Sequence, residues 1–321
     1  MTIKNYKLKI KNYALVVILR QSRRISFLRC FPFISFRVNM TALLSSVFIC
    51  VFYLCSSVFP MFDTSQSFSA RALSLGGAYL ALSDDASAIN INPAGLSQLE
   101  NVEFTGTYTP FYDTKAYSQF FSAATPFGYN TFAASFARTG ISNIYNEDIY
   151  SIGYSRILKE NLFVGLAIKI LGVGAAGYSK YNDPAYSNGR YAFAYDIGYL
   201  NIINKWLTVG AKLENINEPK IKLLSSSNGE KLNSKFKVGM KFTLHKNIFT
   251  LDINDFSGID ENFSFGDEIR FSEFLSFRLG MCNSTPTAGF GMKLKKVETD
   301  FGFFFHKELG ILYRTGLAFR L

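Results

Sequence analysis

The side chains that most often carry catalytic or metal-binding chemistry are sparse in this sequence. It has two histidines, His245 and His306, and neither stands in a motif with a nucleophile and an orienting acid. Three of the four cysteines lie before residue 58, in a segment that is predicted below to be removed as an export leader. Cys282 then remains alone and cannot form an intrachain disulfide or a thiolate metal cluster. We therefore predict that the chain is not an enzyme and has no metal site and no cofactor.

The chemistry that the sequence does offer is electrostatic. Basic residues recur on the polar face of segments whose other face is apolar, namely Lys212, Lys237, Lys241, Arg278, Lys293 and Arg314. If the apolar faces meet lipid, these cations line a lumen, where charges need partners or water. They either pair with Asp84, Asp85 and wall carboxylates to seat an N-terminal plug, or they bind an anion such as a fatty-acid carboxylate.

Strands must position these side chains, because a period of two residues recurs from residue 101 to residue 321. In the last segment Ile311, Tyr313 and Leu317 fall on one face, and Arg314 and Arg320 fall on the other. Fourteen strands are predicted, an even number as in bacterial outer-membrane barrels. Their ranges are 101–110, 115–125, 130–138, 147–157, 161–171, 190–201, 205–214, 234–244, 247–254, 262–271, 274–282, 286–295, 298–306 and 309–321.

Alternation alone fits a soluble β-sandwich as well as a membrane barrel. The links between strands favour the barrel, because the longer ones, 139–146, 172–189, 215–233 and 255–261, are all odd-numbered. The even-numbered links are short, as expected for tight turns at one rim and longer loops at the other. The predicted fold is all-β, an antiparallel membrane barrel of about fourteen strands with a short N-terminal helical plug.

Residues 1–57 have the pattern of an export leader. Nine Lys and Arg residues fall within Lys4–Arg37, and the apolar run Ala42–Leu54 is too short to span a bilayer but fits a signal-peptide core. Cys55 and Ser57 allow cleavage after Ser57, with a retained anchor helix as the alternative; translation starts at Met1 or at Met40. From Asp63 onward 25 basic residues stand against 24 acidic ones, so the net charge of +10 belongs to the leader and indicates no nucleic-acid partner.

Residues 58–100 are rich in small side chains, which suits a segment in a crowded lumen. Ser83 is a predicted helix N-cap with Asp84 and Asp85 in the first turn, and Pro93 disfavours helical geometry at Asn92. The predicted helix is therefore short. It either covers the periplasmic mouth of the barrel or moves to open a path.

The same stretch, Ala70–Leu96, resembles the start of the mature chain in the FadL-like barrel superfamily, above all in its PorV/PorQ branch. The matching residues are Ala70, Arg71, Ala72, Gly76, Gly77, Ala78, Tyr79, Ala81, Asp84, Asp85, Ala86, Ser87, Ala88, Asn92, Pro93, Ala94, Gly95 and Leu96. The resemblance implies a lumenal plug at 58–100, followed by a transmembrane barrel at 101–321. The site residues that it implies in the plug are Arg71, Gly76, Gly77, Asp84, Asp85, Asn92, Pro93 and Gly95.

Two functions follow from this resemblance. The first is a PorV/PorQ-like role in protein secretion or cell-envelope assembly through partner binding, which the length of the mature chain favours. The alternative is FadL-like passive transport of hydrophobic small molecules. The expected partners are outer-membrane lipid together with secretion-system or envelope proteins in the first case, or a hydrophobic ligand in the second. The expected location is the outer membrane, reached through the signal peptide.

Overall fold

The computed structural model describes Phe62 and residues 68–112, 114–175, 190–222, 229–254 and 262–321. The predicted leader, 1–57, lies outside the described residues. The strands and the plug belong to one compact unit, Pro60–His306 with Gly310–Leu321.

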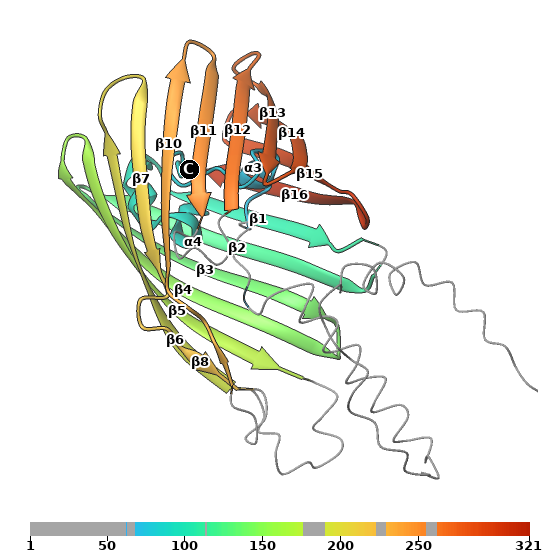
Figure 1. The fold of residues 1–321 in the computed structure, drawn as a ribbon. Helices are drawn as coiled ribbons and strands as arrows, with labels where there is room; N and C mark the ends of the chain where they lie inside the picture. Colours follow the sequence, from blue (N-terminus) through green and yellow to red (C-terminus); the bar gives the residue numbers. More distant parts are fainter. Residues whose placement is uncertain (1–61, 63–67, 113, 176–189, 223–228, 255–261) are drawn as a thin grey trace, which may run out of the picture. The chain divides into compact units, whose positions relative to one another are not determined.

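Fourteen antiparallel strands close into a barrel (Figure 1), which confirms the predicted fold class. The order around the barrel follows the chain, and β1 pairs with β16 to close it. The barrel strands are β1 (Glu103–Pro110), β2 (Ala116–Phe127), β3 (Asn130–Ile141), β4 (Tyr145–Lys159), β5 (Leu162–Gly174), β6 (Arg190–Ile202), β7 (Leu207–Glu214), β10 (Lys235–Leu244), β11 (Asn247–Asn254), β12 (Asn262–Arg270), β13 (Leu275–Cys282), β14 (Thr285–Leu294), β15 (Val297–His306) and β16 (Gly310–Arg320).

Two links differ from the sequence prediction. The link predicted at 139–146 is short, because β3 and β4 continue pairing as far as Ile141 and Tyr145. An ion pair between Arg138 and Asp148, 2.6 Å from Nε to Oδ1, joins these two strands near their ends. The link after β7 contains a small hairpin of its own, β8 (Lys220–Ile221) and β9 (Glu230–Lys231), which alternation over so few residues cannot reveal.

The alternation of burial along the strands separates an outer from an inner face. In β16 Ile311, Tyr313 and Leu317 are exposed on the outer face, whereas Leu312 and Arg314 are buried on the inner one. The outer face is mostly apolar and rich in Phe and Tyr, as lipid requires. In the described part of the chain no helix has the length and hydropathy of a membrane span.

Three short helices precede β1: α3 (Ala70–Ser74), α4 (Ala88–Ile91) and the 3₁₀ helix η1 (Pro93–Gln98). The predicted helix start at Ser83 is wrong: Ser83 has φ +23°, and α4 begins only at Ala88. The predicted stop is confirmed, since Asn92 is extended and its side chain accepts a hydrogen bond from Ala94 N–H at the start of η1. The helices lie within the ring of strands (Figure 1).

Glycines on the inner face of the strands make room for this plug. Where the plug passes, a Cβ atom at Gly210 would lie 2.8 Å from the Leu80 carbonyl oxygen, and one at Gly302 would lie 2.6 Å from the Ala70 carbonyl oxygen. Successive plug segments meet successive strands in this way, from α3 against β14–β16 to Pro93 and Ala94 against β5 and β6. The glycines that face the plug are Gly153, Gly165, Gly198, Gly210, Gly239, Gly266, Gly280, Gly289, Gly302 and Gly316.

The two faces of the wall should respond differently to a change of charge. Leu317→Arg places a cation on the lipid face and should destabilise the inserted barrel by about 2–4 kcal/mol if it lies near mid-bilayer. Lys241→Gln, on the inner face, should cost far less. Urea unfolding of both variants in lipid vesicles measures the difference, and a larger loss for Lys241→Gln would invert the assignment of the faces.

The fit between wall and plug predicts a cost for a single methyl group. Gly210→Ala should destabilise the barrel by about 1–3 kcal/mol, because the new Cβ meets plug backbone that cannot rotate away. Gly106→Ala is the matched control, since its Cβ would meet only the Phe121 side chain at 3.2 Å and that ring can shift. Equal unfolding midpoints for the two variants would show that the plug does not press against the wall.

Candidate functional site

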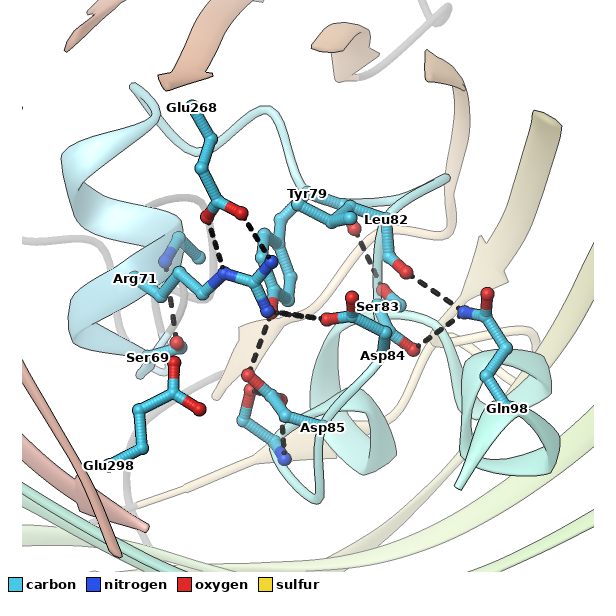
Figure 2. Close-up of polar contacts among 12 residues, drawn as sticks. Ser69, Arg71, Tyr79, Leu82, Ser83, Asp84, Asp85, Gln98, Glu268 and Glu298 are labelled. Atoms are coloured by element: carbon cyan, nitrogen blue, oxygen red, sulfur yellow. Dashed lines mark hydrogen bonds and ion pairs between the residues drawn. The ribbon is translucent and has the colours of Figure 1, made fainter. Parts of the chain in front are cut away.

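Arg71 occupies the centre of the plug and joins it to the wall (Figure 2). Its Nε and Nη2 donate to the two carboxylate oxygens of Glu268 on β12, at 2.7 and 3.0 Å. Its Nη1 donates to Asp84 Oδ1 at 2.6 Å and to the Tyr79 hydroxyl at 3.0 Å. The guanidinium therefore binds one acid of the wall and one acid of the plug, and it is nearly fully buried while doing so. Such a two-sided clamp suits the planar fork of arginine.

The two adjacent acids of the plug lie in different environments. Burial would raise the pKa of the Asp84 carboxyl, but the Arg71 guanidinium outweighs burial and holds that pKa below its ordinary value. Burial and the neighbouring Asp84 charge raise the pKa of Asp85, against hydrogen bonds from Ser87 and Tyr79. Asp85 accepts from the Tyr79 hydroxyl at 2.7 Å and from Ser87, both within the plug.

This arrangement corrects the expected seating of the plug. We expected Asp84 and Asp85 to pair with wall cations such as Lys237, Lys241, Arg278 or Arg314. Asp84 instead forms its ion pair with Arg71 of the plug, and the wall supplies the acid Glu268. The basic residues predicted on the inner face of the strands gave the wrong partner for Asp84, because the cation that binds Asp84 is Arg71 of the plug itself.

The contact at Glu268 extends along the wall. Arg278 on β13 donates to Glu268 Oε2 at 2.8 Å and to Asp300 Oδ1 on β15 at 2.5 Å. Glu298 joins Arg278 to Arg320, at 3.8 and 2.8 Å. Arg320 also binds Glu103 at 2.6 Å, and the other oxygen of Glu103 accepts from the Ala86 N–H of the plug at 2.9 Å. A network of arginines and carboxylates therefore links the plug to β1 and β16, the first and last strands, whose pairing closes the barrel.

Backbone groups of the plug are also held by wall side chains that the sequence analysis did not identify. Asp252 on β11 accepts from the backbone N–H groups of Tyr79 and Leu80 at 2.7 and 2.8 Å. Thr287 donates to the Ser74 carbonyl at 2.9 Å, and Thr107 to the Phe68 carbonyl at 2.8 Å. The sequence places these residues on the polar face of predicted strands. That position does not distinguish side chains that bind the plug from the other polar side chains of a lumen.

A second buried cluster of charges lies on β5, β6, β7 and β10. Lys169 and Lys212 each approach Asp196 to 2.9 Å, and Lys237 approaches Glu214 to 2.7 Å. Lys212 also donates to the Asn90 carbonyl of α4 at 2.8 Å. Two of the predicted lumenal cations, Lys212 and Lys237, are thus brought together here, paired with acids and in contact with the plug.

The other predicted residues are spread through the same interior. Gly76 and Gly77 have φ of +65° and +83°, a conformation that suits glycine at the turn after α3. Asn92 donates to the Leu80 carbonyl within the plug and to the Tyr199 carbonyl of β6, which joins the plug to the wall. Pro93 opens η1 and packs near Gly198, and Gly95 lies against the Ser83 backbone. Arg314 is buried and donates to Thr109 Oγ1 at 2.6 Å.

Below the plug, on the side of the short turns, the interior opens into a recess of about 1060 Å³. Charged residues of both signs line it, including Arg71, Asp84, Glu268, Lys293 and Arg320. Lys293 is exposed there, whereas Lys241 is half-buried on the inner face of β10. Short turns face the periplasm in barrels of this kind, so the recess opens toward the periplasm.

Above the plug, on the side of the long links, the inner face of β2–β6 carries a buried apolar cluster, with the polar side chains of Ser118, Ser151 and Lys169 on the same face. Phe120 stacks on Phe68 of the plug, with ring centroids 5.4 Å apart. The wall side chains that continue this surface toward the long links are Ala137, Ile149, Leu171, Val173, Ala192 and Ala194. The plug therefore has this mainly apolar side of the lumen, here called the apolar half, above it and the charged recess below it.

No protein-family model matches the chain, and no curated protein matches it. Among solved structures, a variant of the monoaromatic hydrocarbon channel TodX matches with TM-score 0.58 and 11% identity over 80% of this chain and 98% of that one. The toluene transporter TodX of P. putida matches with TM-score 0.55 and 10% identity, over 74% and 94%. The chain has the fold of the FadL-like outer-membrane barrels. With its apolar outer face it is an outer-membrane β-barrel. The PorV/PorQ assignment stays a prediction.

The Arg71 clamp predicts a strong effect of one substitution. Arg71→Gln leaves Glu268 and Asp84 without their shared cation and should destabilise the barrel by about 3–5 kcal/mol. If the clamp also closes the lumen, single-channel conductance in planar bilayers should rise. Arg270→Gln is the control, since Arg270 binds the same Glu268 from an exposed position at 3.4 Å and should cost less than about 1 kcal/mol. Similar losses in the two variants would contradict the clamp.

Proposed function

We propose that this barrel is a FadL-like passive channel for hydrophobic small molecules. The observation that carries the proposal is the buried apolar cluster on the inner face of β2–β6, between the plug and the long links. A lumen built for ions or for water-soluble solutes would place polar side chains along this path. Here alanine, leucine, isoleucine, valine and phenylalanine form most of the surface, and the polar side chains among them are few, such as Ser118, Ser151 and the ion-paired Lys169.

The plug continues the apolar surface where the wall meets it. Phe68, Ile89 and Leu96 of the plug pack in the same cluster as Phe120 and Leu171 of the wall. A hydrophobic molecule that enters from the side of the long links would therefore exchange contacts with water for contacts with these side chains. Burial of apolar area favours such entry by about 25 cal/mol per Å².

The fold of the chain adds support, since the solved structures that match it include TodX, named as a toluene transporter and as a monoaromatic hydrocarbon channel. The competing role, a PorV/PorQ-like barrel that serves secretion by binding proteins, does not need an apolar lumen. The two proposals therefore differ in one measurable property, which is the passage of a hydrophobic molecule through the barrel in the absence of any partner.

Transport is tested with the full-length protein, purified from outer membranes and reconstituted in vesicles. We expect a fluorescent hydrophobic probe to enter protein-containing vesicles faster than empty ones, while a sugar of similar size enters both equally slowly. Inserted barrels that pass the probe no faster than empty vesicles would contradict the proposal and favour the partner-binding role.

A substitution in the apolar half of the lumen should affect transport without affecting insertion. Leu171→Asn keeps the side-chain size but adds an amide that must be desolvated along the path, so probe uptake should fall by about tenfold. Lys293→Gln, in the charged recess below the plug, is the control and should leave uptake within about twofold of the original protein, well under the tenfold step. Heat-modifiable migration on gels confirms that both variants fold. An unchanged rate for Leu171→Asn would show that the solute does not cross this surface.

A further inference from the structure

Two charged side chains without an ion-pair partner in the described part of the chain interrupt the apolar outer face of the barrel. On β12 the outward-facing residues are Phe263, Phe265, Asp267 and Ile269, so that a carboxylate stands between a phenylalanine and an isoleucine. On β4 the outward row is Tyr150, Ile152, Tyr154, Arg156 and Leu158, so that a guanidinium stands between a tyrosine and a leucine. Charges on this face are costly in lipid unless they are paired or reach the interface.

Neither charge is satisfied by its own chain in the part that the structure describes. One oxygen of Asp267 is buried among its neighbours and accepts no hydrogen bond. Its partners across the sheet are Phe249 and Leu279, which offer no donor side chain. Arg156 is exposed and pairs across the sheet with Asn130 and Val164.

The same wall shows how an outward charge is treated when a partner is within reach. Arg138 and Asp148 also lie on the outer face, at the other end of β3 and β4. They bind each other through two hydrogen bonds of 2.6 and 2.8 Å. An unpaired carboxylate and an unpaired guanidinium on one wall are therefore exceptions that call for a partner outside the chain.

Asp267 and Arg156 are matched in depth as well as in sign. Asp267 lies three residues before the end of β12 at Arg270, and Arg156 lies two paired positions before the end of β4 at Lys159, because the register shifts between Ile157 and Lys159. Both strands end at short turns, on the same rim of the barrel. At about 3.3 Å per residue the two charges lie about 7 and 10 Å along their strands from the same rim, so their levels differ by about 3 Å or less.

We propose that a second copy of this chain is the partner, with Arg156 of one copy bound to Asp267 of the next. Charge complementarity at nearly equal depth argues for it, because two upright barrels in one membrane can bring the two groups together with little vertical shift. In the order of the strands, β4 and β12 are on nearly opposite sides of the barrel. The contact is therefore head-to-tail and leaves a free half-site at each end, so that it builds rows rather than closed pairs.

The test uses the full-length protein and the neutral variants Arg156→Gln and Asp267→Asn. In native mass spectra of gently extracted protein, we expect the original chain to give dimers and longer rows. Each variant alone should associate about tenfold more weakly, the loss of one well-placed pair. Lys205→Gln, an exposed cation in a turn at the same rim, is the matched control and should associate like the original.

Mixing the variants gives the sharpest outcome. An isotope-labelled Arg156→Gln chain still has Asp267, and an Asp267→Asn chain still has Arg156, so a mixture should form mixed dimers and nothing longer. The exchange Arg156→Asp with Asp267→Arg in one chain should restore rows. Absence of mixed dimers, unchanged association of the single variants, or a monomeric original chain in vesicles would each overturn the proposal. Transport is not measured in this experiment, so its result is independent of the proposed channel.

Discussion

The close approach of the plug backbone to the inner wall is the constraint on which the rest of the interior depends. A side chain as small as alanine at Gly210 or Gly302 would collide with plug carbonyl oxygens. Because the glycines leave this space, the plug contacts the wall strand by strand from β16 to β4. Its backbone groups can then reach wall side chains such as Asp252 and Thr287, and the lumen is divided into two halves of different polarity.

Electrostatics then fixes the plug in place. Arg71 joins Asp84 of the plug to Glu268 of the wall, and Arg278 and Arg320 connect this contact to strands β13, β15, β16 and β1. Buried ion pairs of this kind contribute little net stability compared with apolar packing, but removing one partner is costly. The network therefore mainly fixes the position of the plug relative to the wall strands. The apolar cluster around Phe68 and Phe120 supplies much of the packing.

The strands could be predicted from the sequence because each has one face toward lipid. That face requires an apolar residue at every second position, as in Phe236–Leu244 and Ile311–Leu317. The interior was predictable only in part. The residue types at Lys212, Lys237 and Arg278 indicated a charged lumen, and the three are indeed buried there. Their partners depend on the barrel closing, which places Glu268 beside Arg71 across 197 residues. The helix start at Ser83 failed because the Ser83 hydroxyl donates to the Tyr79 carbonyl, and Asp85 accepts from Tyr79 and Ser87, so that neither side chain caps a helix beginning at Asp84.

The central claim is that the apolar half of the lumen is the path of a hydrophobic solute. Crystals of the protein soaked with a brominated hydrophobic compound test it directly, since the anomalous signal of bromine locates the bound molecule. The account predicts a peak against the inner face of β2–β6, near Phe68, Phe120 and Leu171. A peak confined to the charged recess below the plug, with none in the apolar half, would contradict it.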